Sequence, residues 1–193
     1  MFEILFQKID EKISLSPEEQ ESIKPFFTPK KLRKKQYFLQ AGEVCKYVVF
    51  IEKGALRSYT IDDKGHEHIV QFALEGWWIS DNYSFFTSEP SSYMIDALED
   101  SEILLLSLPD YESMVLKVPK MERYLRILMQ NSLIALQSRI LSSLSYSTEE
   151  KYLKLLSTYP DIIHRFPQHL IASYLGIAPE TLSRIRKKIT FKK

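Results

Sequence analysis

The sequence predicts a protein of the α+β class, with a β-roll of the jelly-roll type first, a long helix next and a small helical domain last. Three patterns support this prediction. Glycines recur at steps of 12, 11 and 11 residues, a spacing typical of turns between short strands, at Gly42, Gly54, Gly65 and Gly76. Apolar residues between 121 and 144 then recur every three or four positions, as on one face of a helix. Beyond residue 147, short helical patterns alternate with prolines and one glycine.

The N-terminal region is expected to begin with a short helix and to continue in strands. Ser16 can cap that helix, and Glu19, three residues later, completes a capping box. Strands are expected where β-branched and aromatic residues gather, at 47–51, 56–61, 66–72, 93–98 and 102–108. Asp62 to Gly65 fits a tight turn between two of them, because Asp and Gly tolerate a positive φ. The basic run 30–35 is expected to form the solvent-exposed face of a first strand.

The helix expected over 121–144 has two apolar stripes. One has heptad-like spacing and consists of Met121, Leu125, Leu128, Ser132, Ala135 and Arg139. The other consists of Tyr124, Ile127, Ile134, Leu141 and Leu144. One stripe can pack on the strands and the other on a second copy of the chain, so the pattern predicts a homodimer. The alternative is that both stripes are buried within one chain.

Two short helices joined by a tight turn are expected near the end of the sequence. The first runs from Pro167 to about Leu175 and ends at Gly176, since glycine readily takes the left-handed conformation that terminates a helix. Pro179 fits the first turn of the second helix, where its missing N–H does no harm. The apolar side of that second helix is formed by Leu182, Ile185 and Ile189. This combination predicts a helix-turn-helix whose polar face is free to enter a major groove.

That polar face is suited to double-stranded DNA. Residues 151–193 hold nine Lys/Arg against two Asp/Glu, a net charge of +7, whereas residues 1–150 hold 17 against 23, a net charge of −6. Arg184 can bond guanine through two N–H groups and Glu180 can accept from cytosine, so these two and Ser183 are the predicted base-reading residues. Phosphate contacts are expected from Thr181, Arg186, Lys187 and Lys188. The alternative is a helical hairpin that only completes a core.

The composition excludes several classes of protein. The net charge is +1, and 45% of the 193 residues are hydrophobic, which is enough for a packed core. The apolar runs are far shorter than the about 20 residues that a membrane-spanning helix needs, and no signal-peptide pattern is present. We therefore expect a cytoplasmic protein with no membrane partner. Cys45 is the only cysteine, which excludes an internal disulfide and an all-cysteine cluster made by one chain.

Two segments carry a resemblance to a known family. The segment "LGIAPETLSRIRKKI" resembles the recognition region of the Crp/Fnr family of bacterial transcription regulators, and "GEVCKYVVFIEKGALRSY" is similar to the family's opening β-roll segment. The family's E-x-x-S-R core maps onto Glu180, Ser183 and Arg184. Pro179 stands where many members carry arginine or valine, so the base contact of those members is absent. The resemblance implies a homodimer that binds an inverted-repeat operator, and it allows RNA polymerase as a further partner.

The resemblance covers nearly the whole chain and implies three domains. These are a cyclic-nucleotide-binding-like β-roll sensor domain at 1–120, a dimerisation helix at 121–146 and a winged helix-turn-helix DNA-binding domain at 147–193. Ser147 and Glu150 can form a capping box at the start of the last domain. Only four residues follow Ile189, which leaves little room for the wing hairpin that often follows the recognition helix in this family.

The effector of such a sensor is not evident from the residues. In nucleotide-binding members a glutamate holds the ribose and an arginine the phosphate, and the matching segment here is "GWWISDNYSFFTSEPSSYMIDALE", Gly76 to Glu99. Asp81 could replace the glutamate, but a serine replaces the arginine, so the main anchor for a phosphodiester is missing and cyclic AMP is not expected. A pocket for another small molecule would be lined by Trp77, Trp78, Asp81, Tyr83, Ser91 and Ser92. No cofactor is assigned, and the family's oxygen-sensing branch is excluded because its cluster needs several cysteines.

Two other functions fit parts of the sequence. His66 and His68 point to one face of a strand and could bind a metal in a cupin-like enzyme, but the next carboxylate, Glu75, comes seven residues later. We therefore predict no enzyme and no metal site. The second alternative is a DNA-binding dimer without an effector, its pocket filled by its own aromatic side chains. No pattern in the sequence identifies the operator, the regulated genes or the choice between activation and repression.

Overall fold

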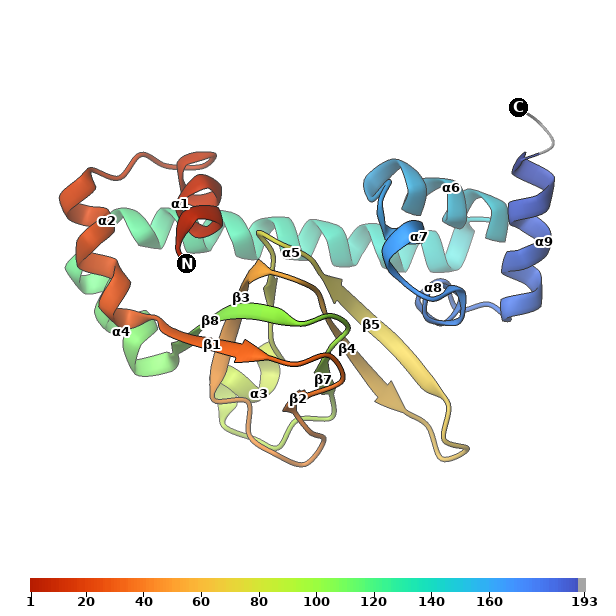
Figure 1. Ribbon diagram of the computed structural model, residues 1–193, viewed down its shortest axis with the longest axis horizontal. Coiled ribbons are helices and arrows are strands. Elements are labelled where there is room, and N and C mark those ends of the chain that lie inside the picture. The colour runs from red at the N-terminus through yellow and green to blue at the C-terminus, as the bar shows by residue number, and fades with distance from the viewer. Residues whose placement is uncertain (191–193) are drawn as a thin grey trace. The chain divides into compact units, whose positions relative to one another are not determined.

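The structure is a computed structural model that describes residues 1–190 (Figure 1). These residues form two compact units. The roll unit consists of Met1–Thr60 and Val70–Asn131, and the helical unit consists of Ile61–Ile69 and the chain from Ser132 onward. The chain therefore passes between the units three times, twice at the ends of the hairpin 61–69 and once inside a long helix. The domain boundaries inferred above remain a prediction.

The roll unit begins with helices α1 (Glu3–Asp10) and α2 (Pro17–Ile23) and the short 3-10 helix η1 (Lys24–Phe26). The capping box at α2 is confirmed, because Ser16 accepts from the Glu19 amide and the Glu19 carboxylate accepts from the Ser16 amide at 2.7 Å. Helix α1 was not predicted. Its first turn is capped by a distant side chain, Glu52, which accepts from the Leu5 amide at 2.8 Å, so no capping signal is present near the helix in the sequence.

Two four-stranded sheets form the β-roll and confirm the predicted fold class (Figure 1). The first has the order β1-β8-β3-β6 and consists of β1 (Thr28–Leu32), β8 (Ser101–Ser107), β3 (Tyr47–Lys53) and β6 (Trp78–Ile79). The second has the order β2-β7-β4-β5 and consists of β2 (Tyr37–Leu39), β7 (Met94–Ala97), β4 (Leu56–Ile61) and β5 (Glu67–Ala73). The apolar run 103–106 is buried because β8 lies between β1 and β3. The run 30–35 lies in and after β1 and is exposed except for Leu32.

Two further helices of the roll unit were not predicted. Helix α3 (Asn82–Thr87) is capped by Asp81, whose carboxylate accepts from the Ser84 amide. Helix α4 (Leu108–Lys117) is capped by Ser107 in the same way through the Asp110 amide. The expected strand 102–108 ends at Ser107 because this cap starts a helix there.

The long helix α5 (Lys120–Ser145) matches the predicted span closely. Its first turns are buried in the roll unit through Met121, Tyr124 and Leu125. None of the helices within residues 1–190 is both long enough and apolar enough to cross a membrane.

The helical unit contains α6 (Thr148–Thr158), α7 (Ile162–Arg165), α8 (Gln168–Leu175) and α9 (Pro179–Thr190). The predicted capping box of Ser147 and Glu150 starts α6. A small core holds these helices together and consists of Tyr152, Leu155, Ile162, Phe166, Leu170, Ile171, Ala172 and Leu182. Most of a wing hairpin after α9 would fall on residues 191–193, which lie outside the described part of the chain.

Candidate nucleic-acid interface

Helices α8 and α9 form the predicted helix-turn-helix. Gly176 ends α8 with a φ of +69°, a left-handed conformation that a residue with a Cβ adopts only at a cost. The turn is closed by the Ile177 amide, which donates to the Ala172 carbonyl at 3.0 Å. Ala172 and Leu182 are fully buried, which packs α8 and α9 closely together. The position of α9 is therefore set by the packing of α8 and by a turn of only a few residues.

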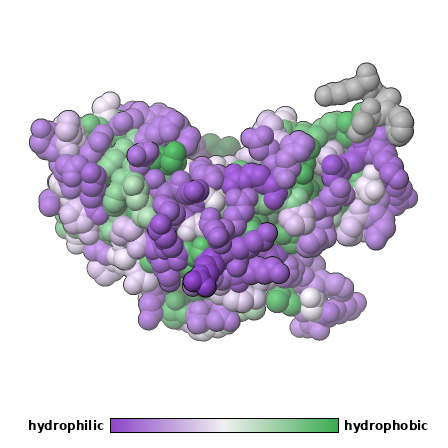
Figure 2. Space-filling model, viewed as in Figure 1, coloured by the Kyte–Doolittle hydropathy of each residue, from purple (hydrophilic) through white to green (hydrophobic). Residues whose placement is uncertain are grey.

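The predicted base-reading residues lie on the side of α9 opposite its buried side. Glu180 and Arg184 are exposed and Ser183 is half-buried, whereas Leu182 has no exposed surface. Arg184 donates to the Thr181 hydroxyl at 3.3 Å, so these two side chains share one surface. Hydrophilic residues predominate along the right-hand edge of Figure 2, where α9 lies. The residues expected to read bases are thus brought together on one accessible face.

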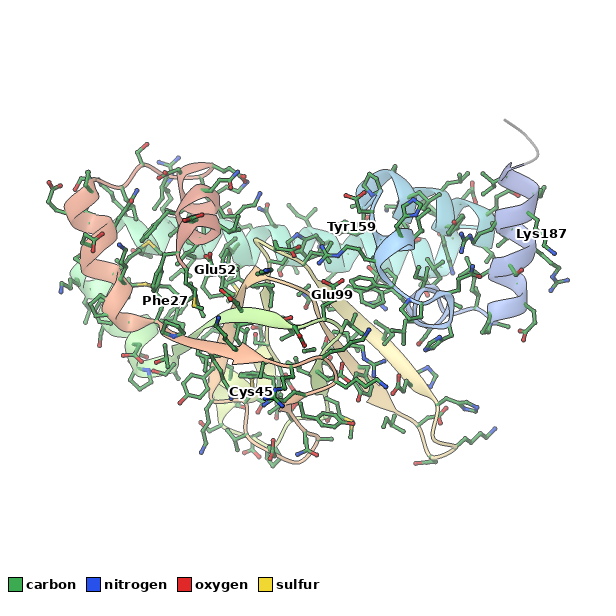
Figure 3. All side chains as sticks on the ribbon, in the orientation of Figure 1. Phe27, Cys45, Glu52, Glu99, Tyr159 and Lys187 are labelled. Atoms are coloured by element: carbon green, nitrogen blue, oxygen red, sulfur yellow. The ribbon has the colours of Figure 1, made fainter. Side chains whose placement is uncertain are left out.

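The predicted phosphate-binding residues are less uniform. Lys187 is exposed and lies on the side of α9 that faces away from α6 and α8 (Figure 3). Lys188 is exposed as well but forms an ion pair of 2.6 Å with Glu149, at the start of α6. Arg186 is half-buried. Burial raises the pKa of the Tyr152 phenol, and the nearby positive charge of Arg186 partly offsets this effect. Of these cations, Lys187 is the best placed for a phosphate, and the roles of all of them remain predictions.

The polar residues of the segment expected to bind an effector form hydrogen bonds with one another. Asp81 and Ser91 are both buried, and the Ser91 hydroxyl donates to the Asp81 carboxylate at 2.7 Å. The other carboxylate oxygen accepts from the Ser84 amide, while the Ser84 hydroxyl donates to the Glu89 carbonyl at 2.6 Å. Ser92 is exposed. Two of the polar residues expected to hold an effector, Asp81 and Ser91, are therefore bonded to each other, and Asp81 also caps α3.

The aromatic residues of the predicted pocket differ in burial and in their contacts. Trp78 packs on Phe50, with ring centroids 5.2 Å apart, and its indole N–H donates to the Tyr124 hydroxyl at 3.3 Å. Burial raises the pKa of Tyr124 to about 12, so this phenol stays neutral at physiological pH. Trp77 is half-buried against the core, and Tyr83 is 66% exposed. The pocket remains a prediction. The contacts of Trp78 with Phe50 and Tyr124 are those of a core residue.

A buried ion pair in the roll unit was not found by sequence reasoning. Arg57 on β4 donates from Nε and Nη2 to the two carboxylate oxygens of Asp96 on β7, at 2.8 and 3.0 Å. The Tyr59 hydroxyl also donates to Asp96, and the Arg57 guanidinium lies 4.1 Å from the Tyr59 ring centre. The pKa of Tyr59 is raised above its ordinary value, and burial is the largest cause. The only signal in the sequence is that two strands, both largely apolar, each contain a charge, and that the charges have opposite signs.

The two histidines considered as metal ligands converge on a carboxylate. The rings of His66 and His68 lie 3.3 and 3.0 Å from the same oxygen of Asp62. The hydrogen bond with His68, together with bonds from the His66 and Lys64 amides, lowers the pKa of Asp62 well below its usual range. Within residues 1–190 no group of three or more His, Cys, Asp and Glu side chains is arranged to hold a metal ion.

The exposed half of α5 forms an aliphatic stripe. Its members are spaced by four, three, four and four residues and are 40–80% exposed, namely Met129, Leu133, Leu136, Ile140 and Leu144. Ile134 and Leu141 lie beside it and are exposed as well. Of the first stripe expected from the sequence, Met121 and Leu125 are buried, Leu128 and Arg139 are half-buried, and Ser132 and Ala135 are exposed. We call the five-residue set the α5 stripe.

Comparisons with known proteins agree with this architecture. Residues 29–117 match the family model described as the cyclic nucleotide-binding domain. The fumarate and nitrate reduction regulatory protein of Vibrio cholerae is 27% identical over 167 residues, which cover 81% of this chain and 66% of that protein. This chain therefore spans about two thirds of the length of that relative.

Solved structures share the fold. FixK2 from Bradyrhizobium japonicum superposes with a TM-score of 0.71 at 19% identity, covering 86% of this chain and 85% of that one. A transcriptional regulator of the Crp/Fnr family from Eubacterium rectale gives a TM-score of 0.67 at 16% identity, covering 92% and 85%. A cyclic-nucleotide-binding-type β-roll, a long helix and a helix-turn-helix define the class of protein. The matched domain model and the relative agree with the Crp/Fnr resemblance found in the sequence, and the solved structures share its fold.

Proposed function

We propose that this protein is a sequence-specific DNA-binding transcription regulator that acts as a homodimer on an inverted repeat. The observation that carries the proposal is the polar face of α9, where Glu180, Ser183 and Arg184 lie opposite the buried Leu182. A helix with this division can enter a major groove while its apolar side stays on α8. Arg184 would bond guanine, Glu180 would accept from cytosine, and Ser183 would bond a base or a phosphate.

Phosphate contacts would place the helix and supply most of the salt-dependent affinity. Lys187 is available for such a contact, and Thr181 and Arg186 lie beside the reading face. Lys188 would exchange its ion pair with Glu149 for a phosphate. Because the lysine is more than half exposed, this exchange costs little.

The α5 stripe supports the homodimer. Five aliphatic side chains at heptad-like spacing on an exposed helix face are typical of a seam between two parallel helices. A dimer formed along α5 presents two copies of α9, and a two-fold pair of reading helices matches half-sites about 34 Å apart. The reading of DNA implies a cytoplasmic protein in a bacterial cell, and a contact with RNA polymerase remains a prediction from the resemblance.

An effector in the β-roll would differ from cyclic AMP. The residues in the place of the family's phosphate-binding arginine are serines, and one of them, Ser91, is bonded to Asp81. This closed arrangement, with Trp78 packed on Phe50, favours the second candidate function, a regulator that binds DNA without an effector. The two candidates differ in one measurable property, which is whether any small molecule shifts the melting temperature of the roll unit.

The experiment that tests the proposal is selection of bound duplexes from a random DNA pool by the wild type, Arg184→Ala and Lys187→Ala. We expect the wild type to enrich a palindrome and Arg184→Ala to lose preference at one symmetric base pair. Lys187→Ala should keep the same preference, bind more weakly and have a salt dependence reduced by about two in slope, because the dimer loses one phosphate contact from each protomer. A wild type that enriches no sequence, with or without candidate effectors, would overturn the proposal.

A further inference from the structure

Ser173 on α8 is bonded to the edge of strand β5. Its hydroxyl donates to the Glu67 carbonyl at 2.6 Å and accepts from the Ile69 amide at 3.0 Å. β5 is an outer strand of its sheet, and an outer strand presents carbonyl and N–H groups away from its neighbour. One hydroxyl therefore satisfies two backbone groups of the hairpin 61–69, and it does so from the first helix of the helix-turn-helix.

Arg139 on α5 strengthens the same junction. Its guanidinium donates to the Ile69 carbonyl at 3.0 Å and, more weakly, to the Tyr174 carbonyl at 3.5 Å. It also lies over the Tyr174 ring, 4.5 Å from the ring centre. The hairpin, α5 and α8 thus meet at adjacent residues, with the amide and carbonyl of Ile69 bonded to different helices.

The junction leaves the reading face open. The hairpin contacts α8 through Ser173, while Glu180, Arg184 and Lys187 on α9 remain exposed. Because α9 follows α8 after a short turn, a contact that holds α8 also holds α9. A helix-turn-helix that is held in place with its reading face accessible loses less conformational freedom when it binds DNA.

We propose that Ser173 and Arg139 are positioning residues that hold α8 on the edge of β5 and keep the helix-turn-helix in its DNA-binding arrangement. The hairpin 61–69 then belongs to the DNA-binding apparatus. This inference rests on the proposed function and deepens it, because it assigns a role in DNA binding to residues that touch no DNA.

The expected effect follows from the lost hydrogen bonds. At the lower end of its usual range one hydrogen bond contributes about threefold to an equilibrium, and Ser173→Ala removes two, so a loss of about tenfold in operator affinity is expected. The loss arises because fewer molecules hold α8 in place before binding. Base preference should not change, since Ser173 lies on α8 and the reading residues lie on α9.

The test uses the full-length protein and two measurements. Hydrogen exchange of the Ile69 amide reports the contact itself, and fluorescence anisotropy with the duplex selected by the wild type reports affinity. The variants are Ser173→Ala, the conservative Ser173→Thr, and Arg139→Lys, which keeps the charge but loses the planar fork. The control is Ser113→Ala, an exposed helical serine whose hydroxyl makes no hydrogen bond within the part of the chain described here.

We expect Ser173→Ala to exchange the Ile69 amide about tenfold faster and to bind about tenfold more weakly with unchanged base preference. Ser173→Thr should recover most of both effects, Arg139→Lys should share the loss, and Ser113→Ala should match the wild type. Unchanged exchange in Ser173→Ala would overturn the contact. Faster exchange with equal or tighter DNA binding would overturn the positioning role. If the wild type selects no duplex, the proposed function fails and the positioning role falls with it, while the exchange result still reports whether the contact exists.

Discussion

Replacing Asp96 by asparagine would remove the carboxylate charge that the buried Arg57 guanidinium bonds. The two side chains are 10% and 9% exposed, and the carboxylate receives three hydrogen bonds, two from Arg57 and one from Tyr59. Removing one partner of a buried ion pair costs about 3–5 kcal/mol, because the remaining charge keeps its desolvation penalty. Asparagine retains one oxygen that can accept from Arg57, so a loss near the lower limit, about 3 kcal/mol, is expected for Asp96→Asn.

Urea unfolding followed by tryptophan fluorescence measures this loss. Both tryptophans, Trp77 and Trp78, lie in the roll unit, so the signal reports the unit that contains the ion pair. With a slope of about 2 kcal/mol per molar urea, the midpoint should fall by about 1.5 M. Asp10→Asn, an exposed aspartate on α1, should leave the midpoint unchanged.

A double variant separates the charge from the packing. Arg57→Met combined with Asp96→Leu removes both charges and keeps apolar volume, so it should recover most of the stability lost in Asp96→Asn. A loss below about 1 kcal/mol in Asp96→Asn, or a double variant as unstable as the single one, would refute the reasoning.

Three further predictions concern the other parts of the chain. Leu136→Glu places a charge in the α5 stripe and should convert the dimer to a monomer in sedimentation velocity, whereas Gln137→Glu should not; a dimeric Leu136→Glu protein would contradict the assigned seam. Gly176→Ala should lower the unfolding free energy of the helical unit by about 1 kcal/mol in circular dichroism, because φ is +69° there, and no change would exclude the left-handed turn. The pKa of Asp62 is lowered in the folded protein, so its stabilising effect should be complete at neutral pH, begin to decline as the pH falls below about 4, and be lost only as the pH falls through the lower folded pKa. The difference in melting temperature between Asp62→Asn and the wild type should therefore be smaller at pH 3 than at pH 7; an equal difference at both values would contradict this assignment.

The elements with local signals were predictable from the sequence. The capping boxes at Ser16 and Ser147 and the turn at Gly176 depend on residues within a few positions of each other. Helix α1 depends on Glu52, which is 47 residues from Leu5, and no local pattern can reveal such a cap. Helix α3 was hidden for a different reason, since its short segment also fitted the expected pocket lining.

In the candidate site, too, the features set by local spacing were predictable and those set by packing were not. Helical spacing alone placed Glu180, Ser183 and Arg184 on one face, since positions three and four apart are neighbours on a helix. The pairing of Lys188 with Glu149 depends on how α9 packs on α6, which spacing within α9 does not contain. Likewise, Arg57 and Asp96 meet because β4 and β7 pair in a register that sets these residues opposite each other.

The three passages of the chain between its units affect how the protein can be recombined with its relatives. A chimaera joined inside α5 near residue 131 would bring the new helix-turn-helix but leave behind the hairpin 61–69, which lies in the other half of the gene. The grafted α8 would then meet a foreign strand edge in place of the Glu67 and Ile69 backbone groups that Ser173 bonds. A transplant of DNA specificity therefore needs two exchanged segments, the hairpin as well as the C-terminal helices.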